Sequence, residues 1–198
     1  MPSEQDFWKV VAVAQGQDKV LLLTFLYTGA RRSELYRLQW ADVDFDLQCL
    51  RLTTKKRQHG SLEADWLPMT DALVEALTEH RQASTSDWVF TQTEGRNQGK
   101  PYMENRGFPR ELCLMAGVKP FGCHAIRHLT GSILGSNNTP TVQIQKMLRH
   151  RRLATTERYI RALQPLRPYL KVLEGGAPTE RSNDGSNSNE KGLRVATS

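Results

Sequence analysis

One pair of strand-like segments interrupts an otherwise helical sequence, and this order of elements constrains the fold more than any other feature. Residues 50–54 (LRLTT) alternate apolar and polar side chains, as a strand with one buried face does. A basic turn over residues 55–61 follows, and residues 65–68 (DWLP) are predicted as the partner strand, which ends at its proline. The pattern predicts a mainly α fold with one small antiparallel β-sheet near the middle of the chain.

Helical patterns flank this hairpin on both sides. Ser3 is placed to cap a first helix, Gly29 to end a second, and Thr70 to cap the helix that follows the hairpin and runs to about residue 82. The other predicted helices cover residues about 18–27, 32–39, 104–116, 123–134, 141–150 and 155–162, with a further short one over 166–173.

The composition changes at Gly175. From there the chain reads GGAPTERSNDGSNSNEKGLRVATS, which is rich in Gly, Ser and Asn and nearly lacks large apolar side chains. Such a segment cannot bury enough surface to offset its conformational entropy. We therefore expect one folded domain over residues 1–174 and a disordered C-terminal tail over residues 175–198.

The overall charge favours an anionic partner without identifying it. The 198 residues include 27 Lys and Arg against 21 Asp and Glu, which gives a net charge of +6 and a pI of about 9.4. A basic surface attracts nucleic acid or an anionic membrane. A solvated basic surface without such a partner is equally consistent with this balance.

Other protein classes are disfavoured. The three cysteines lack a C-x-x-C pair, which argues against a disulfide framework or a zinc finger and favours buried thiols in a reducing cytoplasm: Cys49, Cys113 and Cys123. The N-terminus lacks the apolar core of a signal peptide. No apolar run approaches the ~18 residues that a membrane span needs, so we expect a cytoplasmic protein with no membrane partner.

Short motifs with cationic or imidazole side chains follow one another along the chain. Residues 28–35 (TGARRSEL) put Arg31 just after a predicted helix end, and Lys55 lies in the basic turn. His124 and Arg127 are three residues apart and therefore share one face of a predicted helix.

Two last motifs complete a pattern that resembles the tyrosine recombinases of the phage-integrase type. L-R-H ends at His150, and T-T-E-R-Y ends at Tyr159, 9 residues later. Lys55 lies 24 residues after Arg31, and His150 lies 23 residues after Arg127. Each motif alone is weak, but five in order at matching spacing are specific, and the resemblance covers residues 5–165. It implies the catalytic-domain fold of that family and site-specific DNA recombination of the integration or excision type.

The resemblance assigns roles around a DNA phosphodiester, and the chemistry calls for these residue types. Tyr159 is the nucleophile, and its attack keeps the bond energy in a covalent 3′-phosphotyrosine. Arg31 and Arg127 hold the non-bridging phosphate oxygens, because guanidinium groups are planar and stay protonated. His150 adds a further donor to the phosphate.

Two residues are assigned to proton transfer. His124 is the candidate acceptor of the Tyr159 proton, because imidazole titrates near neutral pH whereas free tyrosine titrates near ~10. Lys55 is the candidate acid for the leaving 5′ hydroxyl, with Lys56 and Arg57 as rivals for that role. No cofactor and no metal are expected, since the cations do the electrostatic work.

Some residues keep a second interpretation. Glu34 either orients Arg31 or lies on the helix surface. His124 and His128 have the i,i+4 spacing of a zinc-binding pair, but Ala125 follows the first histidine where a metalloprotease has glutamate.

Basic residues near the motifs are expected to contact the DNA backbone, where contacts position a protein without reading sequence. Arg149 is one of them, and it stands where the family usually has glycine. The expected contacts are Lys56, Arg57, Lys146, Arg149, Arg151, Arg152 and Arg158.

The resemblance also implies partners. Double-stranded DNA is one, and self-association is the other, with a monomer alone and a tetramer in synapsis. Residues 166–173 either dock onto a neighbouring protomer or pack in their own domain. The family's usual N-terminal core-binding domain is expected to be absent, which leaves truncated, remnant and naturally short forms open. Two rival functions are a DNA-binding module that has lost catalysis and a relaxing enzyme similar to type IB topoisomerases.

Overall fold

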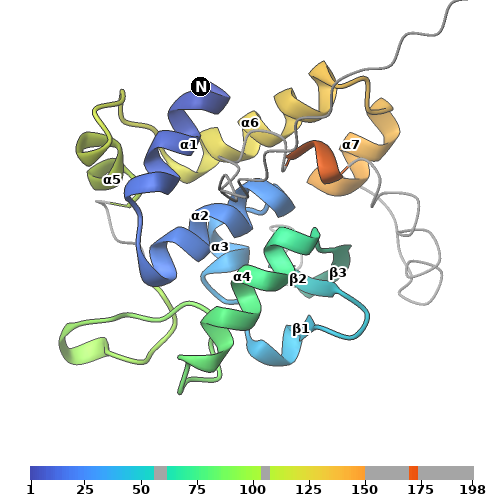
Figure 1. Ribbon diagram of the computed structural model, residues 1–198. Coiled ribbons are helices and arrows are strands. Elements are labelled where there is room, and N and C mark those ends of the chain that lie inside the picture. Colours follow the sequence, from blue (N-terminus) through green and yellow to red (C-terminus); the bar gives the residue numbers. More distant parts are fainter. Residues whose placement is uncertain (56–61, 104–107, 150–169, 174–198) are drawn as a thin grey trace, which may run out of the picture.

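The computed structural model describes residues 1–55, 62–103, 108–149 and 170–173 (Figure 1). The helices are α1 (Glu4–Val13), α2 (Gly16–Thr28), α3 (Arg32–Leu35), α4 (Asp71–Gln82), α5 (Arg110–Met115), α6 (Cys123–Ser136) and α7 (Thr141–Leu148), with short 3₁₀ turns η1 (Trp40–Asp42), η2 (Gly95–Asn97) and η4 (Lys171–Leu173). The strands are β1 (Val43–Asp44), β2 (Cys49–Lys55) and β3 (Leu62–Pro68). The prediction of a mainly α fold with a small antiparallel sheet is confirmed.

The described sheet has the order β1-β2-β3, and both pairings are antiparallel. Leu50 and Leu52 of β2 are fully buried whereas Arg51 between them is exposed, as the alternating sequence predicts. The β2–β3 pairing runs from Cys49 opposite Pro68 to Lys55 opposite Leu62, so the hairpin is longer than predicted. The sequence analysis missed β1 because a strand of two residues has no detectable periodicity.

Three predicted helix ends are confirmed by their hydrogen bonds. The Ser3 hydroxyl accepts the N–H of Asp6 at 3.0 Å, and the Thr70 hydroxyl accepts that of Leu73 at 3.1 Å. Gly29 ends α2 in the left-handed conformation, with φ 55°, and its N–H donates to the Phe25 carbonyl at 2.9 Å.

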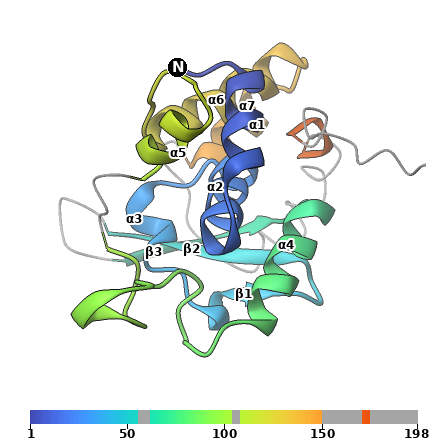
Figure 2. The ribbon, with the colours of Figure 1, turned by 60° about the vertical axis from the view of Figure 1, so that its left-hand side comes forward.

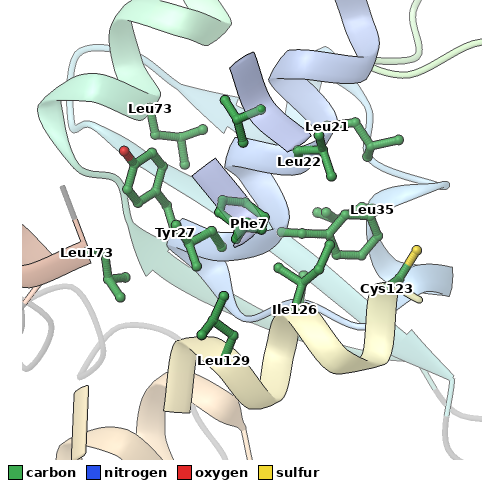
Figure 3. Packing of buried hydrophobic residues seen from close by; sticks show 14 of the residues in the cluster. Phe7, Leu21, Leu22, Tyr27, Leu35, Leu73, Cys123, Ile126, Leu129 and Leu173 are labelled. Atoms are coloured by element: carbon green, nitrogen blue, oxygen red, sulfur yellow. The ribbon is translucent and has the colours of Figure 1, made fainter. Parts of the chain in front are cut away.

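The core lies where the helices meet the sheet. In Figures 1 and 2 the sheet and α4 lie together in one half of the molecule, and α5, α6 and α7 lie in the other. Figure 3 shows Phe7 of α1, Leu22 of α2, Leu35 of α3, Leu73 of α4 and Ile126 of α6 directed into one cluster, and all five are fully buried. Burial of this kind contributes about 1.5–3 kcal/mol for each large apolar side chain.

Two predicted helices were wrong in extent. The helix predicted over 32–39 ends at Leu35, because the backbone beyond it pairs elsewhere: Val89 donates to the Leu38 carbonyl and Trp40 to that of Asp87, each at 2.9 Å. The helix predicted from residue 104 begins at Arg110, because Pro109 lacks the N–H that a helix interior needs.

The C-terminal predictions are tested only at η4. Leu170 and Leu173 are buried in the core of this chain, which favours packing within the domain over docking for these two residues. The predicted helix 155–162 and the predicted tail 175–198 lie outside the described residues. Among the residues that the structure describes, no helix has the length and apolar character to cross a membrane.

Candidate active site

The turn after α2 brings the first motif against the end of α7. A Cβ placed on Gly29 would lie 2.7 Å from Cδ2 of Leu148, the last residue of α7. The left-handed φ of Gly29 also disfavours any side chain there. The backbone conformation therefore favours glycine at this position, and the close approach of the Leu148 side chain adds to that preference.

Arg31 is fixed by Glu34, which lies three residues later in α3. The backbone N–H of Arg31 donates to Glu34 Oε2 at 2.7 Å, and Arg31 Nη1 donates to Glu34 Oε1 at 2.8 Å. The Glu34 side chain is fully buried, whereas that of Arg31 is 39% exposed. Glu34 thus holds the Arg31 backbone and one guanidinium nitrogen, while the Arg31 side chain stays partly exposed to solvent. Of the two interpretations of Glu34, the orienting one is confirmed.

Glu34 accepts hydrogen bonds from two further parts of the chain. The Thr54 hydroxyl of β2 donates to Glu34 Oε1, and Arg149 Nη2 donates to Glu34 Oε2 at 2.5 Å. Burial alone raises the pKa of the Glu34 carboxyl, but Arg149, Thr54 and Arg31 together outweigh burial and hold that pKa below its ordinary value. Glu34 is therefore ionised at neutral pH.

The side chain of Arg127, on α6, also reaches the turn after α2. Its Nη1 donates to the Gly29 carbonyl at 2.5 Å, and its Nη2 donates to the Leu148 carbonyl. The residue is 5% exposed. Burial, with repulsion from Arg149 and Arg31, lowers the pKa of Arg127 to about 10. The guanidinium remains protonated at neutral pH and keeps N–H groups beyond the two that bind carbonyls.

Arg149 occupies an inward position that corrects the sequence-based expectation. It ends α7 in the left-handed conformation, with φ 51°, and its side chain is only 6% exposed. Its guanidinium pairs with Glu34, and its carbonyl accepts from Arg31 Nη2 at 3.4 Å. The sequence predicts a DNA-phosphate contact for Arg149; in the structure its guanidinium pairs with the buried carboxylate of Glu34.

His124 and His128 form an exposed pair on α6. Their Nε2 atoms are 2.9 Å apart and their rings lie edge to face, with centroids 4.4 Å apart. His124 is on the helix that carries Arg127, as the spacing predicts. Among the described residues, no group of three or more His, Cys, Asp or Glu side chains is arranged to hold a metal ion. Cys123 beside them is buried in the core, as expected for packing.

The remaining candidates divide between described and undescribed parts of the chain. Lys55 is the last residue of β2 and directly follows Thr54, so its backbone lies beside the Glu34 cluster. Lys146 is exposed on α7. The other candidates lie outside the described residues: His150, Tyr159, Lys56, Arg57, Arg151, Arg152 and Arg158.

Sequence reasoning missed Thr54 as a partner of this site. A signal for it was present, because Thr54 lies two residues after Leu52, in register with the buried face of β2. A polar side chain in register with buried ones needs a partner, and here the partner is Glu34.

Comparison with known proteins adds a family to this geometry. Residues 5–164 match the sequence pattern described as the phage integrase family. Prophage integrase IntF of Escherichia coli K12 is 28% identical over 161 residues, which are 77% of this chain and 33% of that protein. The y4gC protein of Sinorhizobium fredii is 29% identical over 191 residues, 88% of this chain and 97% of that protein.

Solved structures share the fold. The integrase from mycobacterium phage Brujita superposes with a TM-score of 0.66 at 22% identity, covering 87% of this chain and 58% of that one. The chain thus spans about a third of the IntF sequence and somewhat over half of the Brujita integrase structure.

Proposed function

The chain belongs to the phage integrase family, and from this premise we propose that it is a tyrosine-type site-specific DNA recombinase that cleaves and rejoins strands through Tyr159. The observation that carries the proposal is the meeting of Arg31 and Arg127. These residues are far apart in the sequence, yet both lie at the turn after α2. Together with Arg149 they form a cluster of three arginines around the Glu34 carboxylate.

An excess of fixed positive charge at one point suits a phosphodiester. Arg31, Arg127 and Arg149 outnumber the two carboxyl groups near them, those of Glu34 and Asp65, so the cluster attracts a dianionic transition state. Donors that are already in place when charge develops commonly contribute ~3–4 kcal/mol each to its stabilisation. Arg31 and Arg127 are the proposed donors to the phosphate oxygens, with His150 as a third.

Proton transfer belongs to residues around this cluster. His124 is the proposed acceptor of the Tyr159 proton, since imidazole is the side chain that most often acts as a general base. Lys55, at the end of β2, is the proposed acid for the leaving 5′ hydroxyl. The Tyr159 oxygen forms a bond to phosphorus as the bond to the 5′ oxygen breaks, so rejoining by the reverse attack needs no external energy source.

The proposed partner is double-stranded DNA, bound through its phosphates. Lys146 and the basic residues beside Lys55 and Tyr159 would contribute contacts that weaken as salt rises. The proposal includes assembly of four protomers on two duplexes during recombination, a monomer in isolation, and a cytoplasmic location.

A covalent adduct tests the proposal directly. The protein is incubated in EDTA with labelled, nicked duplexes tiled from the DNA that flanks its gene, and the products are run on denaturing gels. A protease-sensitive shifted band that depends on Tyr159, and is lost in Tyr159→Phe, is expected. A band that persists in Tyr159→Phe would refute the nucleophile. Salt-sensitive DNA binding without any band would favour a DNA-binding module that does not cut.

A further inference from the structure

The inward Arg149 side chain is the least expected charged group of the structure. A charged residue at a helix end is normally solvated, yet this guanidinium is buried and its Nε has no hydrogen-bond partner. It also stands at a positive φ, which disfavours any residue with a Cβ. Two unfavourable features at one residue call for a compensating interaction, and the pair with Glu34 is that interaction.

Contacts run in a short chain from Arg149 to Arg31. Arg149 holds Glu34 Oε2 at 2.5 Å, and the same oxygen accepts the backbone N–H of Arg31. The other oxygen, Oε1, accepts from Arg31 Nη1 and from the Thr54 hydroxyl. The two carboxylate oxygens of Glu34 thus bind different partners, and only one guanidinium nitrogen of Arg31 binds Glu34.

Loss of the Arg149 guanidinium would change this division. Oε2 would keep only the backbone N–H of Arg31, and a buried carboxylate with an open acceptor draws the nearest cation. The nearest is Arg31, whose planar guanidinium can bind both oxygens of a carboxylate at once. An Arg31 side chain bound in that way is turned away from solvent, where the phosphate would lie.

We propose that Arg149 is a positioning residue of the active site: it holds Glu34 from the inner side and thereby keeps Arg31 directed at the scissile phosphate. The proposal rests on the proposed function of Arg31. It assigns to the Arg149 side chain an effect on the reaction through Glu34, beside the direct contact of the Arg149 carbonyl with Arg31 Nη2, and without contact with DNA.

The proposal predicts an altered pH dependence. Glu34 is faced by Arg31 at the start of α3, Arg149 at the end of α7, Arg127 of α6 and Asp65 of β3. Arg149 is the largest of the influences that hold the pKa of Glu34 down, so its removal raises that pKa. Each pH unit below the pKa lowers the ionised fraction about tenfold. On acidification, cleavage by a variant without Arg149 should therefore begin to fall at a higher pH than cleavage by the parent.

The experiment compares Arg149→Gln, Arg149→Lys and Glu34→Gln with the parent. Adduct formation on nicked duplex is measured from pH 8 down to the lowest pH at which thermal unfolding shows each variant still folded, together with DNA affinity at fixed salt. Arg110→Gln, an exposed change of the same charge on α5, controls for lost DNA attraction. Arg149→Gly, which suits the positive φ, controls for backbone strain.

The expected result is a lower adduct rate for Arg149→Gln than for the parent at pH 8, and a decline on acidification that begins at a higher pH than in the parent. Arg149→Lys should retain most of the rate, and Arg110→Gln should match the parent. In the Glu34→Gln background, Arg149→Gln should add no pH dependence, which separates Glu34 from Asp65 and the histidines.

Identical pH profiles for the parent, Arg149→Gln and Arg149→Gly would overturn the proposal. So would an extra pH dependence that survives in Glu34→Gln. If the parent itself forms no Tyr159-dependent adduct, the proposed function fails; the coupling of Arg149 to Glu34 is then tested by whether Arg149→Gln and Glu34→Gln have non-additive effects on unfolding, and additive effects would overturn it.

Discussion

The buried side chains around Glu34, which we call the Glu34 cluster, and the exposed His124–His128 pair differ in how they hold charge. Glu34 is fully buried and paired with side chains from α3, β2 and α7. The histidines are exposed on α6 and are paired with each other. The difference matches their proposed tasks. A group that stabilises charge must stay fixed and ionised, whereas a group that transfers protons must exchange them with water.

The comparison also predicts how stability and activity are connected. In the buried cluster the same contacts hold the fold and the catalytic groups, so a substitution should affect both. At the exposed pair the two effects should separate.

The largest effect is expected for Arg127→Ala. Its removal leaves the Gly29 and Leu148 carbonyls without donors in a buried place, which should lower the free energy of unfolding by about 2–4 kcal/mol. Adduct formation should fall about 100-fold or more. Denaturant unfolding and the nicked-duplex assay measure the two effects. Arg110→Ala serves as the exposed control, and an Arg127→Ala protein as stable as the parent would break the connection.

Gly29→Ala should follow closely. The added Cβ meets Leu148 Cδ2 at 2.7 Å and must adopt a left-handed φ, for an expected destabilisation of about 2–4 kcal/mol. Gly16 has a similar φ of 52° with nothing within 4 Å, so Gly16→Ala should show the backbone cost alone, about 1 kcal/mol. Equal losses of unfolding free energy in the two variants would show that the close approach of α7 to Gly29 adds nothing to the cost of the substitution.

Glu34→Gln is expected to lower the free energy of unfolding by about 1–3 kcal/mol at neutral pH. The pKa of Glu34 lies below its ordinary value of 4.5, so its stabilising contribution is present above pH 4.5 and is lost as pH falls through the lowered pKa. The gap between parent and variant should therefore be constant from neutral to mildly acidic pH and close in stronger acid. A gap that closes already near neutral pH would contradict the ionised carboxylate.

The smallest effect on stability is expected at the histidine pair. His124→Ala should change the free energy of unfolding by no more than about 0.5 kcal/mol, because the side chain is exposed. Adduct formation should nevertheless fall about 100-fold, the usual contribution of a general base. His128→Ala, on the same face, tests whether the pair or His124 alone matters. A large loss of stability in either variant would mean that the two regions do not differ as described.

Much of this arrangement can be predicted from the sequence. Gly29 marks the end of α2, Ser3 and Thr70 mark two helix starts, and alternation over 50–54 marks β2, because each signal depends on contacts within a few residues. The spacing of His124 and Arg127 also places them on one helix. These features are local, and local physical chemistry is sufficient for them.

The features that escaped prediction depend on distant parts of the chain. Helix α3 stops at Leu35 because Leu38 and Trp40 bond to residues near position 88. Arg149 turns inward because Glu34, which is 115 residues away in sequence, offers it a buried carboxylate. Because basic residues flank Arg149, the sequence predicts a contact between Arg149 and DNA. The pairing of Arg149 with Glu34 is visible only in the tertiary structure.

The two carbonyl contacts of Arg127 have a consequence for the order of assembly. They join α6 to Gly29, 98 residues earlier, and to Leu148, 21 residues later. Contacts between distant segments form late in folding, after the intervening chain has collapsed. A chain that ends before α7 lacks the Leu148 carbonyl that Arg127 binds and the Arg149 guanidinium that Glu34 binds. The complete arrangement around Glu34 would therefore form only once α7 has been made and has docked.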